Sequence, residues 1–207
     1  MKRSFIVAGL LLLVSSILFF GISSADAATA SCDLRSEMRR LWEDHITWTR
    51  LFIVSFAANL PDQDIASARL LQNQSDIGNA IKPFYGEEAG NKLSTLLRDH
   101  ILGAVEVLKA AKAGNQAQLD TANRKWQSNG DDIAAFLGSA NPKHWPATTM
   151  KTEMKKHLDL TLTEASNRLN GKFAEDAKDF DRIHEHILHL ADTLSSGIEG
   201  QFPDKFK

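Results

Sequence analysis

Apolar residues recur at intervals of three and four along almost the whole chain after Leu34, which is the pattern of amphipathic α-helices. Prolines and glycines such as Pro61, Pro83 and Gly114 interrupt this pattern. Proline has no amide N–H for the helical ladder, and glycine accepts the left-handed backbone found at helix ends. We therefore predict six helices, over residues 33–60, 63–82, 87–112, 116–138, 148–169 and 173–199.

The segments between these helices are short, and the longest loop, residues 138–146, contains Pro142 and Pro146. Long helices joined by short loops run antiparallel to their neighbours. The pattern shows no alternation of strands and helices, which disfavours a nucleotide-binding α/β enzyme. The sequence thus predicts an all-α, up-and-down antiparallel bundle of about six helices, forming a single domain over residues 28–207.

Three histidines recur at nearly constant spacing. His45 and His100 are 55 positions apart, His100 and His157 are 57 apart, and each lies near the middle of the first helix of a predicted hairpin. The second helices carry polar pairs at matching places, namely Asp76/Asn79, Asn129/Asp132 and His186/His189. The chain is therefore predicted to consist of three copies of one αα-hairpin.

These polar residues share a position on the helix surface. At about 100° of rotation per residue, each repeated histidine lies at the margin of the apolar face, and one member of each polar pair lies at the same margin. Its partner, one turn further on, points about 60° more outward. If the margins face one axis, the groups form an internal cluster whose candidate members are His45, His100, His157, His186, His189, Asp76, Asn129 and Asp132.

Imidazoles mixed with carboxylates suit a divalent transition metal, with Zn²⁺, Cu²⁺ and Fe as candidates. The cluster is accordingly predicted to bind a metal ion or a small ligand. The same groups can instead hydrogen-bond to one another as a purely structural polar core, in an envelope-associated structural or interaction module. A third interpretation is an enzyme or redox protein that no motif reveals.

Motifs of the common enzyme classes are missing from the sequence. Ferritin-like di-iron bundles use Glu-x-x-His pairs, whereas Glu153 and Glu185 precede the nearest such histidines, His157 and His189, by four residues. The sequence contains no Gly-rich phosphate loop, no Gly-x-Ser-x-Gly elbow and no His-Glu-x-x-His helix. These observations favour a protein without catalytic activity.

Composition narrows the choice of partners and of stabilising forces. The chain is 43% hydrophobic with a net charge of −2, and it has no basic stripe with interleaved aromatics, so nucleic acid is not an expected partner. Cys32 is the only cysteine, so no intramolecular disulfide can form and stability must come from packing. Trp42 and Trp126 are predicted core residues, and Trp145 is predicted to pack the long loop onto the bundle.

The first residues have the organisation of an export signal. Lys2 and Arg3 precede an apolar run over residues 5–22, and Ser24 to Ala27 supply small residues for a signal peptidase. We predict a signal peptide over residues 1–27 and an exported protein, extracellular or associated with the cell envelope. The alternative is an uncleaved anchor, in which case this segment is the membrane contact.

Several strings resemble a family of small secreted helical proteins from Gram-positive bacteria. They include Leu-Trp-Glu-Asp-His-Ile-Thr-Trp-Thr-Arg (41–50), Asp-Ile-Gly-Asn-Ala-Ile-Lys-Pro-Phe-Tyr-Gly (76–86) and Ile-His-Glu-His-Ile-Leu-His-Leu-Ala-Asp (183–192). The resemblance implies the helical fold and implies no activity. Some members carry the labels glycosyltransferase or acetylglutamate kinase, chemistries that normally use an α/β architecture not expected here.

Overall fold

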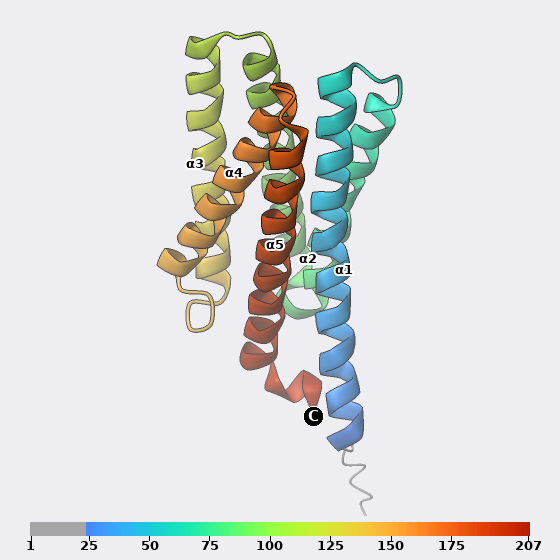
Figure 1. Ribbon diagram of the computed structural model, residues 1–207. Coiled ribbons are helices and arrows are strands. Elements are labelled where there is room, and N and C mark those ends of the chain that lie inside the picture. Colours follow the sequence, from blue (N-terminus) through green and yellow to red (C-terminus); the bar gives the residue numbers. More distant parts are fainter. Residues whose placement is uncertain (1–23) are drawn as a thin grey trace, which may run out of the picture.

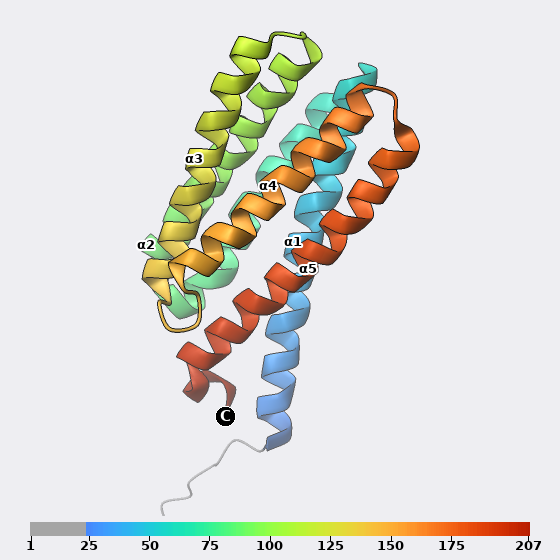
Figure 2. The same ribbon diagram turned by 60° about the vertical axis from the view of Figure 1, so that its left-hand side comes forward.

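The computed structural model describes residues 24–207, and within them every regular element is helical. The elements are α1 (Ser24–Ala58), α2 (Gln63–Lys112), α3 (Gln116–Ala140), α4 (Ala147–Leu169), α5 (Phe173–Gln201) and the short 3₁₀ helix η1 (Pro203–Phe206). The helices lie side by side in an elongated bundle, and short loops at its two ends connect them (Figures 1 and 2). The predicted all-helical class is confirmed.

The predicted number of helices differs from the structure. The segments 63–82 and 87–112 were expected as two helices, but they form the one element α2 because Gly86 alone departs from helical geometry, with φ 84° and ψ 171°. Such backbone angles are open to glycine only, so a single residue turns the chain and no loop is needed. The two halves of α2 then run back along each other (Figure 1). Ser94 Oγ of the second half donates to the Gln74 carbonyl oxygen of the first at 3.4 Å.

The two halves of α2 approach each other most closely at Gly78 and Gly90. A Cβ atom added to either glycine would lie 2.6 Å from the carbonyl oxygen of the other, closer than real Cβ atoms come. Two residues without side chains therefore allow backbone-to-backbone packing at this crossing. This contact fixes how the second half of α2, which carries His100, lies against the first.

The other helix ends follow the predictions within two residues, except at the start of α1. Gly114 and Gly171 have positive φ, and Asn115 caps α3 by accepting a hydrogen bond from the Gln118 amide at 3.1 Å. Residues 24–32 are helical as well, so α1 extends N-terminal to the predicted start at residue 33. The apolar run of the predicted signal peptide, residues 5–22, lies outside the described residues. Among the described helices, none combines the length and the apolar character needed to cross a bilayer.

One main apolar core follows the bundle axis, and its most deeply buried members include Ile77, Ile133 and Ile187. Each such side chain stabilises the fold by roughly 1.5–3 kcal/mol. Trp42 and Trp126 belong to this core, as predicted. Trp145 anchors the long loop, because its ring is buried and its Nε1–H donates to the Thr193 carbonyl at 3.2 Å. The polar site described next lies inside this apolar surrounding.

Candidate metal centre

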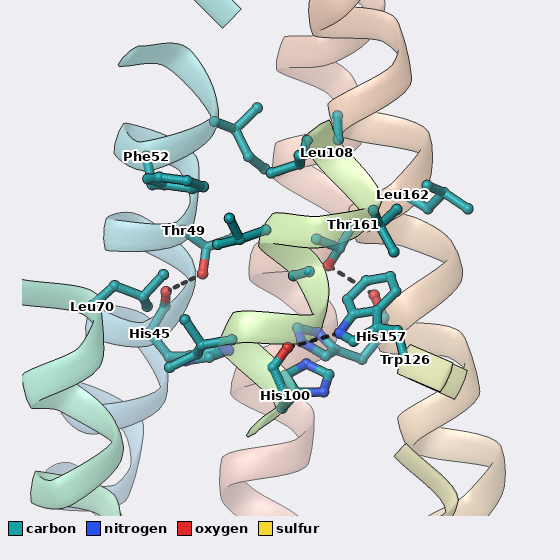
Figure 3. Close-up of a pocket in the computed structure, with 16 residues that line it drawn as sticks. His45, Thr49, Phe52, Leu70, His100, Leu108, Trp126, His157, Thr161 and Leu162 are labelled. Carbon is teal, nitrogen blue, oxygen red and sulfur yellow. Dashed lines mark hydrogen bonds between the residues drawn. The ribbon is translucent and has the colours of Figure 1, made fainter. Parts of the chain in front are cut away.

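Three buried histidines from three helices meet in the bundle interior. His45 comes from α1, His100 from the second half of α2 and His157 from α4, and each is only 3–4% exposed. Their ring centroids are 5.8–6.4 Å apart. One ring nitrogen of each lies within 4.8 Å of the other two (Figure 3). We call these three residues the histidine triad.

The position of each histidine on its helix explains why the rings converge. The residues that follow them, Ile46, Ile101 and Leu158, are buried in the apolar core. Each histidine is therefore rotated by one residue, about 100°, from a core position, at the edge of the buried stripe. Helix α4 contacts both α1 and α2, so these edges face the same interior space. The internal convergence predicted from the spacing of the three histidines is present.

Hydrogen bonds fix the orientation and tautomer of His100. Asn129 Nδ2 donates to the Leu96 carbonyl at 3.1 Å, which leaves Asn129 Oδ1 facing His100 Nδ1 at 3.1 Å. An amide oxygen only accepts, so His100 Nδ1 carries the proton and Nε2 has the free lone pair. Trp126 stacks on the ring at 5.3 Å, and its Nε1–H donates to the His100 carbonyl at 3.0 Å. Asn129 thus orients the His100 ring and is not itself a member of the triad.

The other two rings of the triad are less well satisfied. The Nδ1 atoms of His45 and His157 are buried, and no hydrogen-bond partner for either occurs among the described residues. Such an atom costs about 1–3 kcal/mol compared with a paired one. The triad therefore holds two unpaired buried nitrogens beside a third ring with a defined lone pair.

All three rings are neutral near pH 7. Burial lowers the pKa of His45 to about 4. Burial, reinforced by the neighbouring His45, lowers the pKa of His100 to about 3. Burial and the neighbouring histidines hold the pKa of His157 well below its usual value. A neutral imidazole keeps one lone pair on nitrogen, so each ring is in the form that binds a metal.

His186, a further predicted site residue, lies beside the triad on α5. Its ring centroid is 6.2 Å from that of His157. Its Nε2–H donates to the Glu153 carbonyl at 3.2 Å, and its Nδ1 is 3.5 Å from Glu153 Oε2. His186 therefore extends the row of imidazoles but faces the Glu153 carboxylate.

The structure does not bring the remaining predicted residues into the cluster. Asp132 and His189 are exposed, because one further turn and an outward rotation carry them to the surface. Asp76 is half-buried and accepts a hydrogen bond from Gln72 at 3.0 Å. Asn73, one turn earlier, takes the buried position on that helix, and its Nδ2 donates to the Leu41 carbonyl at 2.9 Å.

A small cavity adjoins the triad. It has a volume of about 30 Å³ and extends from the three rings between α1, α2 and α4 (Figure 3). Apart from the histidines, Trp126 and the hydroxyls of Thr49 and Thr161, its walls are aliphatic or phenyl side chains and include Phe52, Ile53, Leu70, Val107, Leu108 and Ala165.

Sequence reasoning missed a second buried polar group, which we call the ion network: Arg50, Glu164, Asp176 and Arg168. Arg50 Nη1 donates to Glu164 Oε1 at 2.6 Å and to Asp176 Oδ1 at 2.8 Å, and Arg168 Nη1 donates to Asp176 Oδ2 at 3.3 Å. Both carboxylates are buried. Burial raises the pKa of Glu164 to about 7 against the opposing effect of Arg50. Glu164 follows His157 by seven residues, so its place on the same helix face was a usable signal.

No protein-family model, curated protein or solved structure matches the chain. The resemblance to secreted helical proteins therefore stays a prediction. Any assignment of function rests on the chemistry of the histidine triad and its surroundings.

Proposed function

We propose that this protein is an exported helical bundle that binds one transition-metal ion through His45, His100 and His157. The observation that carries the proposal is the approach of one nitrogen from each ring to within 4.8 Å of the others, inside an apolar core. Neutral imidazole is the form that coordinates Zn²⁺, Cu²⁺ and Fe, and here burial keeps all three rings neutral.

The distances allow a metal after a small contraction. Metal–nitrogen bonds of about 2.0–2.1 Å in tetrahedral geometry require nitrogens about 3.4 Å apart. Nitrogens that are up to 4.8 Å apart must therefore approach each other by about 1.4 Å or less. A movement of this size is within the range of side-chain rotation.

The charge of the site favours copper, as the monovalent ion, over the other predicted metals. Three neutral ligands supply no negative charge, and a buried uncompensated charge is costly. A monovalent copper ion carries half the charge of Zn²⁺ or Fe²⁺, and imidazole suits copper. We therefore expect copper(I) to bind most tightly, and divalent ions to require an anion as an additional ligand.

The proposal includes the internal repeat. Each triad histidine lies on the first helical segment of a pair: α1 with the first half of α2, the second half of α2 with α3, and α4 with α5. The members of each pair are consecutive in the chain and in contact, although α3 also contacts α4 and α1 also contacts α5. Three copies of one hairpin would each contribute one imidazole, which explains the near-constant spacing of the ligands.

A purely structural polar core is the alternative, and the hydrogen bonds weigh against it. A structural network is stable when its buried polar atoms are paired. The His45 and His157 Nδ1 atoms have no partner among residues 24–207. Only the His100 ring, held by Asn129, has the satisfied arrangement that such a role requires.

The test is metal loading of the purified protein with copper(I), Cu²⁺, Zn²⁺ and Fe²⁺, followed by measurement of stoichiometry and thermal unfolding. One ion per chain is expected, and a free metal concentration 100 times the Kd should stabilise the fold by about 2.7 kcal/mol. His157→Leu should abolish this gain, whereas His189→Leu, at an exposed histidine, should leave it unchanged. Binding of no ion, or equal binding by the two variants, would overturn the proposal.

A further inference from the structure

We propose that the cavity beside the histidine triad is the binding place of one uncharged diatomic molecule, such as dioxygen or carbon monoxide, held at the open coordination position of the triad metal. This inference rests on the proposed metal site and adds the class of ligand that the metal accepts. It is carried by the size of the cavity, by the chemistry of its walls and by its position relative to the three rings.

The size of the cavity restricts the ligand. A cavity volume of about 10–15 Å³, measured in the same way, is needed to hold one water molecule. The volume of about 30 Å³ next to the triad is therefore enough for two water-sized atoms and too small for an organic substrate. A diatomic molecule has this size.

The walls exclude charged and strongly hydrogen-bonding ligands. Thr49 Oγ1 donates to the His45 carbonyl at 2.7 Å, and Thr161 Oγ1 donates to the His157 carbonyl at 2.9 Å. Both hydroxyl protons are thus used within their own helices, and the other walls are mainly aliphatic and aromatic. Water needs two to four polar partners to be held well, so once a metal engages the ring nitrogens this cavity favours an apolar guest.

The arrangement of polar and apolar groups matches the two ends of such a ligand. The three rings lie at one end of the cavity, the two threonines lie beside it, and Phe52 and Leu108 lie toward the other end (Figure 3). Three imidazoles leave at least one position open on a metal with a preference for four ligands. A diatomic molecule bound there would place its first atom on the metal and its second against apolar side chains. Binding of carbon monoxide forms one dative bond from its carbon to the metal and changes no oxidation state.

The experiment uses the protein loaded with copper(I) without oxygen, with carbon monoxide as the probe. Copper stoichiometry is measured first, and carbon monoxide is then titrated while the C–O stretching band is followed by infrared spectroscopy. The expected result is one carbon monoxide per copper and a single narrow band, because one enclosed site gives one environment.

Ala165→Leu tests whether the ligand occupies the cavity, since Ala165 is buried and lines it. We expect unchanged copper stoichiometry and carbon monoxide binding at least about tenfold weaker, or 1.4 kcal/mol. Ala135→Leu, the same change at an exposed site on α3, should bind carbon monoxide as the unmodified protein does.

Since Ala165→Leu risks misfolding, xenon binding to the metal-free unmodified protein, followed by ¹²⁹Xe NMR, provides a second measurement. A bound-xenon shift there supports the cavity assignment, and its absence contradicts it.

The outcomes separate the two proposals. One copper per chain without carbon monoxide binding would overturn the ligand assignment and leave the metal site intact. Equal carbon monoxide affinity in folded Ala165→Leu and Ala135→Leu would overturn it as well, because the ligand would then reach the metal from another side. A chain that binds no copper would overturn the ligand assignment, and a chain that binds none of the four metal ions would overturn the metal site as well.

Discussion

The histidine triad and the ion network both contain buried polar groups and share helices α1 and α4, but their atoms are paired differently. In the ion network, Arg50 donates to both buried carboxylates, and Arg168 donates to Asp176 as well. In the triad, Asn129 hydrogen-bonds to His100, whereas the Nδ1 atoms of His45 and His157 have no hydrogen-bond partner among the described residues. The first group combines opposite charges, whereas the second combines three neutral rings of the same kind.

This difference indicates which of the two groups is complete. Burying a charge is tolerated when it is paired and hydrogen-bonded, and the ion network meets that condition with protein atoms alone. The Nδ1 atoms of His45 and His157 lack such partners among the described residues. An added ligand would therefore stabilise the triad more than the ion network. Comparison of the two groups therefore separates a structural polar group from a candidate binding site.

The largest expected effect is the loss of Arg50. Arg50→Met leaves Glu164 and Asp176 buried without their main cation and should destabilise the fold by about 3–5 kcal/mol. His157→Leu removes a ring that has no paired side chain and should change stability in the absence of metal by about 1 kcal/mol or less, in either direction. Urea unfolding of both variants measures the difference.

Arg182→Met is the matched control for Arg50→Met. Arg182 donates to Asp179 at 3.1 Å, but its side chain is 64% exposed, so its removal should cost about 1 kcal/mol or less. If Arg50→Met and His157→Leu destabilise the metal-free protein equally, the distinction between a complete and an incomplete group is wrong.

The next effect is an opposite pH dependence of the two groups. Unfolded His45 takes up a proton near pH 6.5, but native His45 does so only near pH 4, so the unfolded state binds more protons in between. Stability therefore falls as the pH drops through this window, by up to about 1.4 kcal/mol per pH unit for this one histidine. Native Glu164 takes up its proton near pH 7 instead of 4.5, so its contribution to stability rises as the pH drops from 7 to 4.5.

Urea unfolding at steps between pH 7 and pH 4 tests these two signs. Compared with the unmodified protein, His45→Leu should lose less stability on acidification, and Glu164→Gln should lose more. The reverse order would show that the triad is protonated in the native state or that Glu164 is ionised throughout.

The smallest effect concerns Asn129, which fixes the tautomer of His100. Groups that orient a metal-binding histidine typically contribute 10–100-fold to metal affinity, so we expect Asn129→Ala to weaken copper binding by about that factor. Asp132→Ala, one turn away and exposed, should change the affinity by less than about twofold. Competition with a copper chelator measures both, and equal affinities would remove Asn129 from the site.

The sequence predicted the helical class well because helix periodicity is a local property. It failed at Gly86, since one glycine can reverse the chain inside a helical pattern that otherwise continues on both sides. The equal spacing of His45, His100 and His157 identified the triad. The angular positions of Asp76 and Asn73 around their helix did not show which of the two is buried. Such angles describe one helix and not the neighbouring helix that covers it.

The ion network was missed for a related reason. Its members come from α1, α4 and α5, and the partners Arg50 and Asp176 are 126 positions apart in the chain. A charged residue on a predicted helix is usually placed at the surface, since unpaired charges are costly to bury. Only the packing of distant helices reveals that these charges are paired and therefore buried.

The backbone contact between Gly78 and Gly90 also affects the position of His100. Gly90 is ten residues before His100 on the same rigid segment, a distance of about 15 Å. An alanine at either glycine must push the two halves of α2 apart or tilt them, and His100 would move with its helix toward or away from the other two rings. The spacing of the three imidazole rings is thus set partly by a backbone contact that touches none of them.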